Sequence, residues 1–272
     1  VANIGMGSGL TTHTLLSSPY INRIDTIEIE SAIVEGANYF RPRVERAYSD
    51  ARSHIYIEDA KTFFSTHNKK YDLIISEPSN PWVSGVSSLF SVEFYKRMTN
   101  YLEDDGMLVQ WLHLYEISTP LIFSVLKALT SHFSNFAIYS TGNSDMLVIA
   151  RNGGAVELPK EEIFDHLNVL EDLTLINLNN IHDIHARFIG NNEILLPLIN
   201  SYNATTNSDY FPILDLNAPR DRFMGQTGAS FNAIKQVPLP IIKMILPGHD
   251  IIDSEKVSEH KSYPFSLNTA AA

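Results

Sequence analysis

Three glycines near the start of the chain are the first residues whose spacing suggests a binding site. They form the pattern Gly5-x-Gly7-x-Gly9 between an apolar run that ends at Ile4 and a helix-like stretch. Glycines let a ligand lie against the backbone, where the start of a helix exposes free N–H groups. A nicotinamide-dinucleotide site would need a glycine where Leu10 stands, and a phosphate-binding loop would need a Gly-Lys-Ser/Thr sequence. The pattern therefore disfavours both of these and leaves a nucleoside as the expected ligand.

Acidic side chains follow the next two apolar runs. Glu28 lies near the end of the run from 24 to 29, where a carboxylate can accept hydrogen bonds from both hydroxyls of a ribose. Asp59 follows the run from 55 to 57 and could accept from an adenine amino group. Acids at strand ends and helix starts also serve as caps, which is the alternative for both residues and for their neighbours Glu30 and Glu58. Three candidate contacts in chain order nevertheless predict one nucleoside site.

A stiff polar loop follows the fourth apolar run. Glu77-Pro78-Ser79-Asn80-Pro81-Trp82 comes directly after residues 71–76. Each proline restricts the residue before it to extended conformations, so the side chains of Glu77 and Asn80 are fixed in direction. Ligands of open α/β sheets bind beyond the carboxyl ends of the strands, which puts this loop beside the nucleoside. Residues 83–90 are predicted to close over a ligand, and a rigid loop with a surface carboxylate is the simpler alternative.

Strands and helices must alternate to position these residues. Apolar runs at 1–4, 24–29, 55–57, 73–75 and 107–112 are separated by helix-like stretches. The alternation predicts a parallel sheet with helices on both faces. The last two runs, 136–139 and 146–149, are joined by a loop short enough for an antiparallel hairpin. This plan predicts an α/β, Rossmann-like class I methyltransferase fold: a seven-stranded, mostly parallel sheet with a terminal antiparallel hairpin.

The alternation stops near residue 153, after Arg151-Asn152-Gly153-Gly154. We therefore expect a nucleoside-binding transferase domain over 1–152 and a mainly helical C-terminal extension over 153–272. Helices are expected near 160–170 and 190–202. Because the chain opens inside a strand, we expect it to be a fragment whose upstream part is absent.

Composition excludes several other classes of function. The 272 residues are 44% hydrophobic, and 20 Lys and Arg against 31 Asp and Glu give a net charge of −11, which disfavours nucleic acid and suits a cationic substrate. The absence of cysteine excludes disulfides, thiolate metal sites and a cysteine nucleophile. His182 and His185 have no apparent third ligand, so we expect no metal. No apolar run approaches the roughly 20 residues of a membrane span, and we expect no signal peptide before the first motif. We expect a cytoplasmic protein, or the cytoplasmic domain of a membrane protein.

Together these motifs resemble the spermidine synthase family. The resemblance is carried by the glycine pattern, Ile27-Glu28-Ile29-Glu30, Glu58-Asp59-Ala60, residues 71–75 and the run from Pro81 to Tyr95. More narrowly, the chain is similar to a bacterial branch whose synthase-like domain is fused to a membrane region. That similarity extends to Asn207-Ser208-Asp209-Tyr210-Phe211-Pro212 and Ala218-Pro219-Arg220. It covers residues 1–150 well and 205–222 in patches.

The resemblance implies S-adenosylmethionine or its decarboxylated form as co-substrate and a small-molecule amine as acceptor. It places Glu28 on the ribose and Asp59 near the adenine. The full set of cofactor-binding residues that it implies is Gly5, Gly7, Gly9, Glu28, Glu58, Asp59 and Ala60.

It also implies three catalytic positions, Glu77, Asn80 and Gln110. The family has aspartates where Glu77 and Asn80 stand. Glu77 keeps a carboxylate and is the expected general base, whereas Asn80 lacks the charge that would pair with an ammonium. Gln110 matches a family position that faces donor and acceptor.

The chemistry expected is displacement at a carbon next to a sulfonium, with transfer of an aminopropyl group to an amine. Methyl transfer needs the same geometry and attacks a different carbon on the sulfur, so a methyltransferase of unknown acceptor is one alternative. An inactive nucleoside-sensing domain, which Asn80 favours, is another. The chain could assemble as a homodimer.

Overall fold

An eight-stranded sheet forms the centre of the computed structural model, which describes residues 1–142 and 144–236. The strand order is β3-β2-β1-β4-β5-β7-β6-β8. The first five strands in this order run parallel: β3 (Ser53–Ile57), β2 (Ile24–Glu28), β1 (Ala2–Ile4), β4 (Tyr71–Ser76) and β5 (Leu102–His113). The last three are antiparallel to their neighbours: β7 (Asp145–Arg151), β6 (Asn135–Ser140) and β8 (Phe188–Asn191).

This order confirms the class I methyltransferase fold that the sequence predicts. A parallel block is followed by the β6–β7 hairpin, in which Ser140 lies opposite Met146. The predicted number of seven strands is wrong by one, because β8 adds an eighth at the edge of the sheet, where Asn191 lies opposite Ala137. The sequence predicts a helix from residue 190 onward. The four residues of β8 are too few for an alternating pattern to show.

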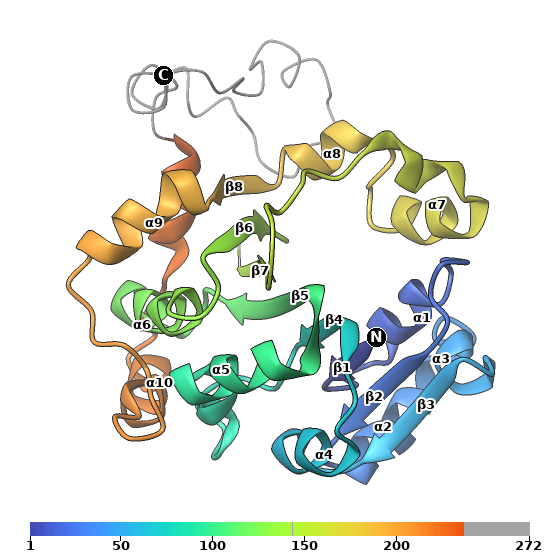
Figure 1. Ribbon diagram of the computed structural model, residues 1–272, viewed down its shortest axis with the longest axis horizontal. Helices are drawn as coiled ribbons and strands as arrows, with labels where there is room; N and C mark the ends of the chain where they lie inside the picture. Colours follow the sequence, from blue (N-terminus) through green and yellow to red (C-terminus); the bar gives the residue numbers. More distant parts are fainter. Residues whose placement is uncertain (143, 237–272) are drawn as a thin grey trace.

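Helices cover both faces of the parallel block. Figure 1 shows α4 (Ala60–His67), α5 (Val92–Tyr101) and α6 (Thr119–Thr130) along one side. On the other side α1 (Leu10–Leu15) packs against α3 (Glu45–Ser49), and α2 (Ser31–Ala37) continues into the short 3₁₀ helix Asn38–Phe40. The side chain of Glu30 accepts the Ala32 N–H and caps α2, of which Ser31 is the first residue.

The principal core lies between the sheet and the α4–α6 layer. Phe63, Phe64, Phe94 and Tyr95 have exposed fractions of 1% or less and pack against strand residues such as Ile74. The side chain of Ser91 accepts the Phe94 N–H at 3.2 Å and fixes where α5 begins. The core therefore holds the strands whose carboxyl ends carry the candidate residues.

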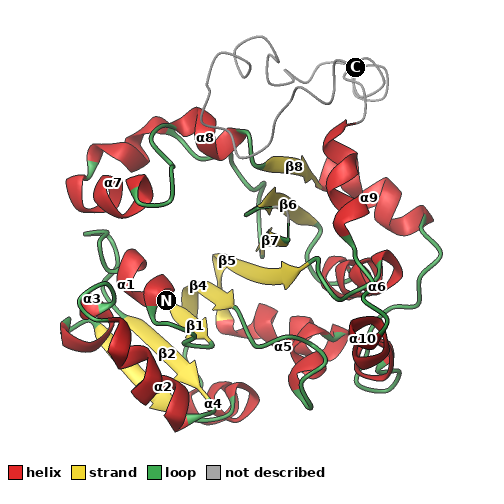
Figure 2. Cartoon of the chain, turned by 180° about the vertical axis from the view of Figure 1, so that it is seen from behind, coloured by secondary structure: helices red, strands yellow, loops and turns green. Residues whose placement is uncertain are grey.

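The C-terminal extension curves around the sheet, as Figure 2 shows from the back. It contains α7 (Leu167–Thr174), α8 (Ile181–His185), α9 (Asn192–Ser201), α10 (Ile213–Phe223) and the 3₁₀ segments Glu161–Asp165 and Ala229–Gln236. The helix expected over 160–170 is therefore a 3₁₀ segment in its first part and the start of α7 in its second. Helices α9 and α10 both pack on α6. Helix α7 contacts α1 and α3, because its Asp172 pairs with His13 and Arg46. The boundary near residue 153 stays a prediction.

None of the described helices is long and apolar enough to cross a membrane.

Candidate active site

The candidate residues meet at one edge of the sheet. Strands β1 to β4 run parallel, so the glycine loop after β1, Glu28 at the end of β2, Asp59 after β3 and Glu77 after β4 all leave the sheet at its carboxyl edge. This is the arrangement that the sequence predicts. The loop from β1 lies in the middle, between the ends of β2 and β4.

Gly5 is the glycine of the loop that the structure most strictly requires. Its φ is +90°, and a Cβ atom built on it would lie 2.4 Å from the carbonyl oxygen of Glu77. Its amide donates to the carbonyl of Ile27 at 2.8 Å. Gly7 and Gly9 also have positive φ angles, of 51° and 82°, but neither faces such a contact. The loop therefore packs tightly against the strand end that carries the predicted base.

Glu28 is a buried carboxylate that shapes the glycine loop. One oxygen accepts the Met6 N–H at 2.9 Å, and the other accepts the Glu30 N–H at 3.0 Å. Only 8% of the residue is exposed. Each carboxylate oxygen has two acceptor positions, so the side chain keeps capacity for ribose hydroxyls.

Asp59 serves as a helix cap. Its Oδ1 accepts the N–H of Thr62 at 2.9 Å and the Thr62 hydroxyl at 3.1 Å, which fixes the start of α4. Asp59 therefore caps a helix, which was the alternative to a contact with adenine, and it is exposed at the carboxyl edge of the sheet. Glu58 donates its amide to the Glu28 carbonyl at 2.9 Å, and Ala60 is buried as the first residue of α4. These contacts tie the 58–60 segment to the end of β2.

Glu77 combines partial burial with access to the edge. Its amide donates to the Ile4 carbonyl at 3.0 Å, and its Oε2 accepts the hydroxyl of Thr11 at 3.1 Å. Desolvation by burial raises the pKa of the carboxyl to about 7, against the opposing effect of hydrogen bonds from Thr11 and Asn3. A carboxyl group with a pKa near neutrality can take up and release protons at physiological pH.

Asn80 lies beside a cluster of rings that continues the same loop. Its Oδ1 accepts the Tyr115 hydroxyl at 3.3 Å. The His113 ring, which ends β5, lies 4.9 Å from Trp82, 5.6 Å from Trp111 and 4.8 Å from Tyr115, measured between centroids. Burial lowers the pKa of His113 to about 4, so this imidazole is neutral at physiological pH. Trp82 and Trp111 therefore pack around an uncharged ring.

Gln110 does not reach the edge in the way that the resemblance implies. Its side chain has an exposed fraction of 0%, and its amide donates to the carbonyls of Ser76 at 3.1 Å and Trp111 at 2.9 Å. Its oxygen accepts the Tyr95 hydroxyl at 3.3 Å. Because both ends of the amide are occupied inside the core, the structure gives Gln110 a packing role and speaks against direct contact with a ligand.

Comparison with known proteins decides the family. The model of the spermine/spermidine synthase domain matches residues 1–142, about half of the chain. The chain belongs to the spermine/spermidine synthase family. The resemblance that the motifs carry is thereby confirmed, and the membrane-fused branch stays a prediction.

Two curated relatives of this family member are polyamine aminopropyltransferases. The one from Alkaliphilus oremlandii is 37% identical over 106 residues, which are 39% of this chain and 37% of that protein. The one from Clostridioides difficile is 37% identical over 107 residues, 39% of this chain and 38% of that protein. The matches thus span about two fifths of these relatives. A crystal structure of a probable spermidine synthase from Corynebacterium glutamicum is 14% identical in sequence and aligns with a TM-score of 0.51. The alignment covers 76% of this chain and 71% of that protein's chain, which shows a shared fold.

Contacts of Asn207 that the sequence does not predict connect the extension to the segment after the Glu77 loop. The buried side chain of Asn207 donates to the carbonyls of Ser87 at 3.3 Å and Phe90 at 3.0 Å and accepts the Leu214 N–H at 3.1 Å. The short 3₁₀ helix Val86–Phe90 is therefore bound to the extension, and closure of residues 83–90 over a ligand stays a prediction. The 207–212 motif was visible in the sequence, but not its contacts.

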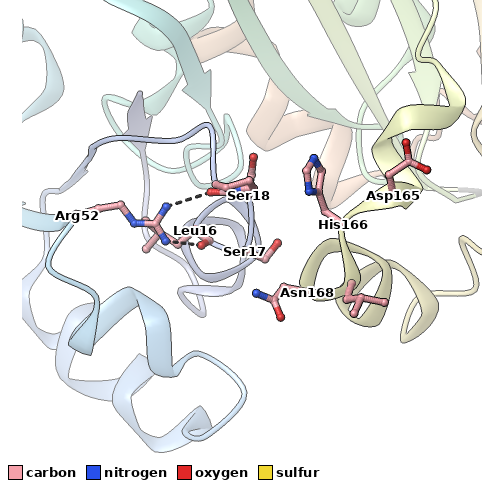
Figure 3. Close-up of a pocket in the computed structure, with 9 residues that line it drawn as sticks. Leu16, Ser17, Ser18, Arg52, Asp165, His166 and Asn168 are labelled. Carbon is pink, nitrogen blue, oxygen red and sulfur yellow. Dashed lines mark hydrogen bonds between the residues drawn. The ribbon is translucent and has the colours of Figure 1, made fainter.

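A cavity of about 500 Å³ lies away from these residues (Figure 3). It is lined by the end of α1, by Arg52 just before β3 and by residues 165–168, and so lies toward the amino ends of the strands. The Arg52 guanidinium is already bound by the carbonyls of Leu16, Ser18 and Ile21 and by Asp50. The arginine of this cavity is therefore already occupied, and Asp165 is the acidic residue of the lining. Within residues 1–142 and 144–236, no cluster of three or more His, Asp or Glu could hold a metal.

Proposed function

We propose that this chain is a transferase that moves the aminopropyl group of decarboxylated S-adenosylmethionine to a small-molecule amine. Family membership and the polyamine aminopropyltransferase relatives support this chemistry. The observation that carries the proposal is Glu77, a partly buried carboxylate with a pKa of about 7 beside the glycine loop. A proton acceptor at this place is what attack by an amine requires.

The donor would lie across the carboxyl edge. Glu28 binds the ribose hydroxyls with the acceptor positions that its amide contacts leave open. The glycine loop lies under the nucleoside, and the segment from Glu58 to Ala60, with exposed Asp59, lies near the adenine. These assignments require only residues whose strands the sheet already brings together.

The transfer forms one bond and breaks another. The nitrogen lone pair of the acceptor attacks the carbon next to the sulfonium, a carbon–nitrogen bond forms, and the carbon–sulfur electron pair returns to sulfur to give methylthioadenosine. The proton that leaves the nitrogen goes to Glu77. An alkylammonium has a pKa of about 10 and no lone pair on its nitrogen, so a nearby carboxylate has to take this proton before the nitrogen can attack. The leaving group is already activated by its charge, which limits the task of the protein to alignment and proton removal.

The acceptor side differs from an ammonium-binding site. Asn80 is neutral, and its oxygen is shared with the hydroxyl of Tyr115. Tyr115 is partly exposed on this side, whereas the neutral His113 ring is buried and the Arg222 guanidinium lies 5.0 Å from the centroid of the Trp82 ring. An amine bound here is therefore held by hydrogen bonds and by contact with Tyr115, with Glu77 as the carboxylate of the loop.

The test is release of methylthioadenosine from decarboxylated S-adenosylmethionine with a panel of amines. Glu77→Gln should reduce turnover by at least a hundredfold, in the range of a lost general base, and leave binding of methylthioadenosine by calorimetry intact. Glu103→Gln, an exposed acid at the start of β5, is the matched control. Turnover that survives Glu77→Gln would refute the role of Glu77.

The same experiment separates the alternatives. Faster turnover of S-adenosylmethionine, measured by release of S-adenosylhomocysteine, than of its decarboxylated form would identify a methyltransferase. Binding of methylthioadenosine with no turnover of either donor would identify a nucleoside-sensing domain, which neutral Asn80 favours.

A further inference from the structure

We propose that Thr11 is a positioning residue for Glu77: its hydroxyl holds one oxygen of the carboxylate and directs the group toward the acceptor. Thr11 lies in the first turn of α1, immediately after the glycine loop. The hydroxyl donates to Oε2 of Glu77 at 3.1 Å across 66 positions of sequence. The inference rests on the proposed role of Glu77 as the base.

The two threonines that follow the glycine loop have different tasks. Thr12 is buried, and its hydroxyl pairs with that of Thr26 on β2 at 2.8 Å. Thr11 is only partly buried and faces the neighbouring strand end instead. The hydroxyl of Thr11 therefore contacts the candidate base, whereas that of Thr12 lies in the core.

The surroundings of Glu77 leave its carboxylate dependent on hydrogen bonds for stabilisation. The groups that act on its carboxyl, within the described part of the chain, are the neutral side chains of Thr11 from α1 and Asn3 from β1. At the same edge, Glu28 of β2 is occupied by two backbone amides, and the ring of His113 from β5 is uncharged. With no cation to stabilise the ionised form, hydrogen bonding to the carboxylate oxygens opposes the desolvation that raises its pKa.

The consequence is a defined response to removing the hydroxyl. Thr11→Val keeps the shape of the side chain and deletes the donor, so the pKa of Glu77 should rise by about one. At pH 7 the ionised fraction of the base, and with it kcat/KM, should fall about fivefold and recover at pH 9. Thr11→Ser keeps the hydroxyl and should restore the wild-type profile. A merely structural loss would reduce activity equally at both pH values.

The experiment has two arms on the same variants. Carbon-detected NMR titration measures the pKa of the Glu77 side-chain carboxyl, with Glu77→Gln used for assignment, and the pH dependence of kcat/KM is measured in parallel. Thr14→Val, on the same helix, is the matched control. A higher Glu77 pKa in Thr11→Val alone supports the inference. An unchanged pKa in Thr11→Val overturns it, whatever the activity. Absence of turnover in the wild type, with a shifted pKa in the variant, refutes the proposed function instead.

Discussion

Replacing Gly5 with alanine tests how tightly the glycine loop packs on the predicted base. The added Cβ would lie 2.4 Å from the carbonyl oxygen of Glu77, whereas Cβ atoms essentially never come closer than 3.0 Å to another heavy atom. Either atom must therefore move by roughly 0.6 Å. Movement is resisted because Glu77 donates its amide to the Ile4 carbonyl and Gly5 donates its amide to that of Ile27.

The magnitude follows from comparing two glycines of the same loop. Alanine at a left-handed φ costs about 1 kcal/mol, and this is the whole expected cost at Gly7, which has φ +51° and no atom within 4 Å of its added Cβ. At Gly5, with φ +90°, the displaced carbonyl and the weakened strand contacts add about 2 kcal/mol. Gly5→Ala should therefore lose about 3 kcal/mol of unfolding free energy and Gly7→Ala about 1 kcal/mol.

Urea unfolding of both variants measures these losses, and the slope of the transition checks that the denatured state is unchanged. Calorimetric binding of methylthioadenosine should weaken in Gly5→Ala even where the protein is fully folded, because the loop and Glu77 move together. Equal losses in the two variants would show that the carbonyl of Glu77 yields freely, and the inferred tight packing would be wrong.

Three further predictions concern residues around the site. Asn207→Ala should lose about 3 kcal/mol of unfolding free energy in urea, because three buried groups lose their partner, whereas Asn217→Ala, which removes one partly buried bond, should lose under about 1 kcal/mol. The pKa of His113 is about 4 in the folded chain and 6.5 as the unfolded reference, so the unfolded state binds the proton first and stability is lost as pH falls. Between pH 7 and pH 5 this effect should lower the free energy of unfolding of the wild type by roughly 2 kcal/mol, and His113→Phe should remove that decrease. The same pH dependence of stability in the variant would contradict the burial of a neutral ring. For Glu77 the sign is reversed, since its pKa rises from 4.5 to about 7 on folding and stability falls as pH rises through this range. Glu77→Gln should therefore be more stable than the wild type by about 3 kcal/mol at pH 8 and equal to it at pH 4, as thermal unfolding can measure.

The parallel block and its edge could be predicted because their signals are local. Glycine spacing, apolar runs and acids at strand ends are each readable within a few residues, and parallel pairing then brings their carboxyl ends together. The roles at that edge were less readable. Asp59 is an N-cap and Gln110 is a buried hydrogen-bonding residue, and neither fact follows from residue type alone.

Contacts of the extension could not be predicted because they join distant segments. Asn207 binds carbonyls more than a hundred residues earlier in the chain. Asp172 of α7 pairs with Arg46 of α3 at 2.6 Å, and β8 extends the sheet by pairing with β6. A backbone carbonyl or a surface arginine leaves no mark in the sequence that identifies its partner. The motif at 207–212 pointed to the segment as part of the family resemblance, but it did not show that Asn207 binds the carbonyls of Ser87 and Phe90.

The donor loop and the candidate base behave as one unit in this fold. Gly5 has no side chain where the Glu77 carbonyl approaches, and Thr11, six residues later, holds the carboxylate of the same glutamate. Both contacts come from the segment that joins β1 to α1, which is also the segment expected to lie under the nucleoside. A shift of the glycine loop would therefore be passed to Glu77 through these two contacts. In the function that we propose, this coupling would keep the attacked carbon and the base in fixed relation, which is what in-line transfer to an amine requires.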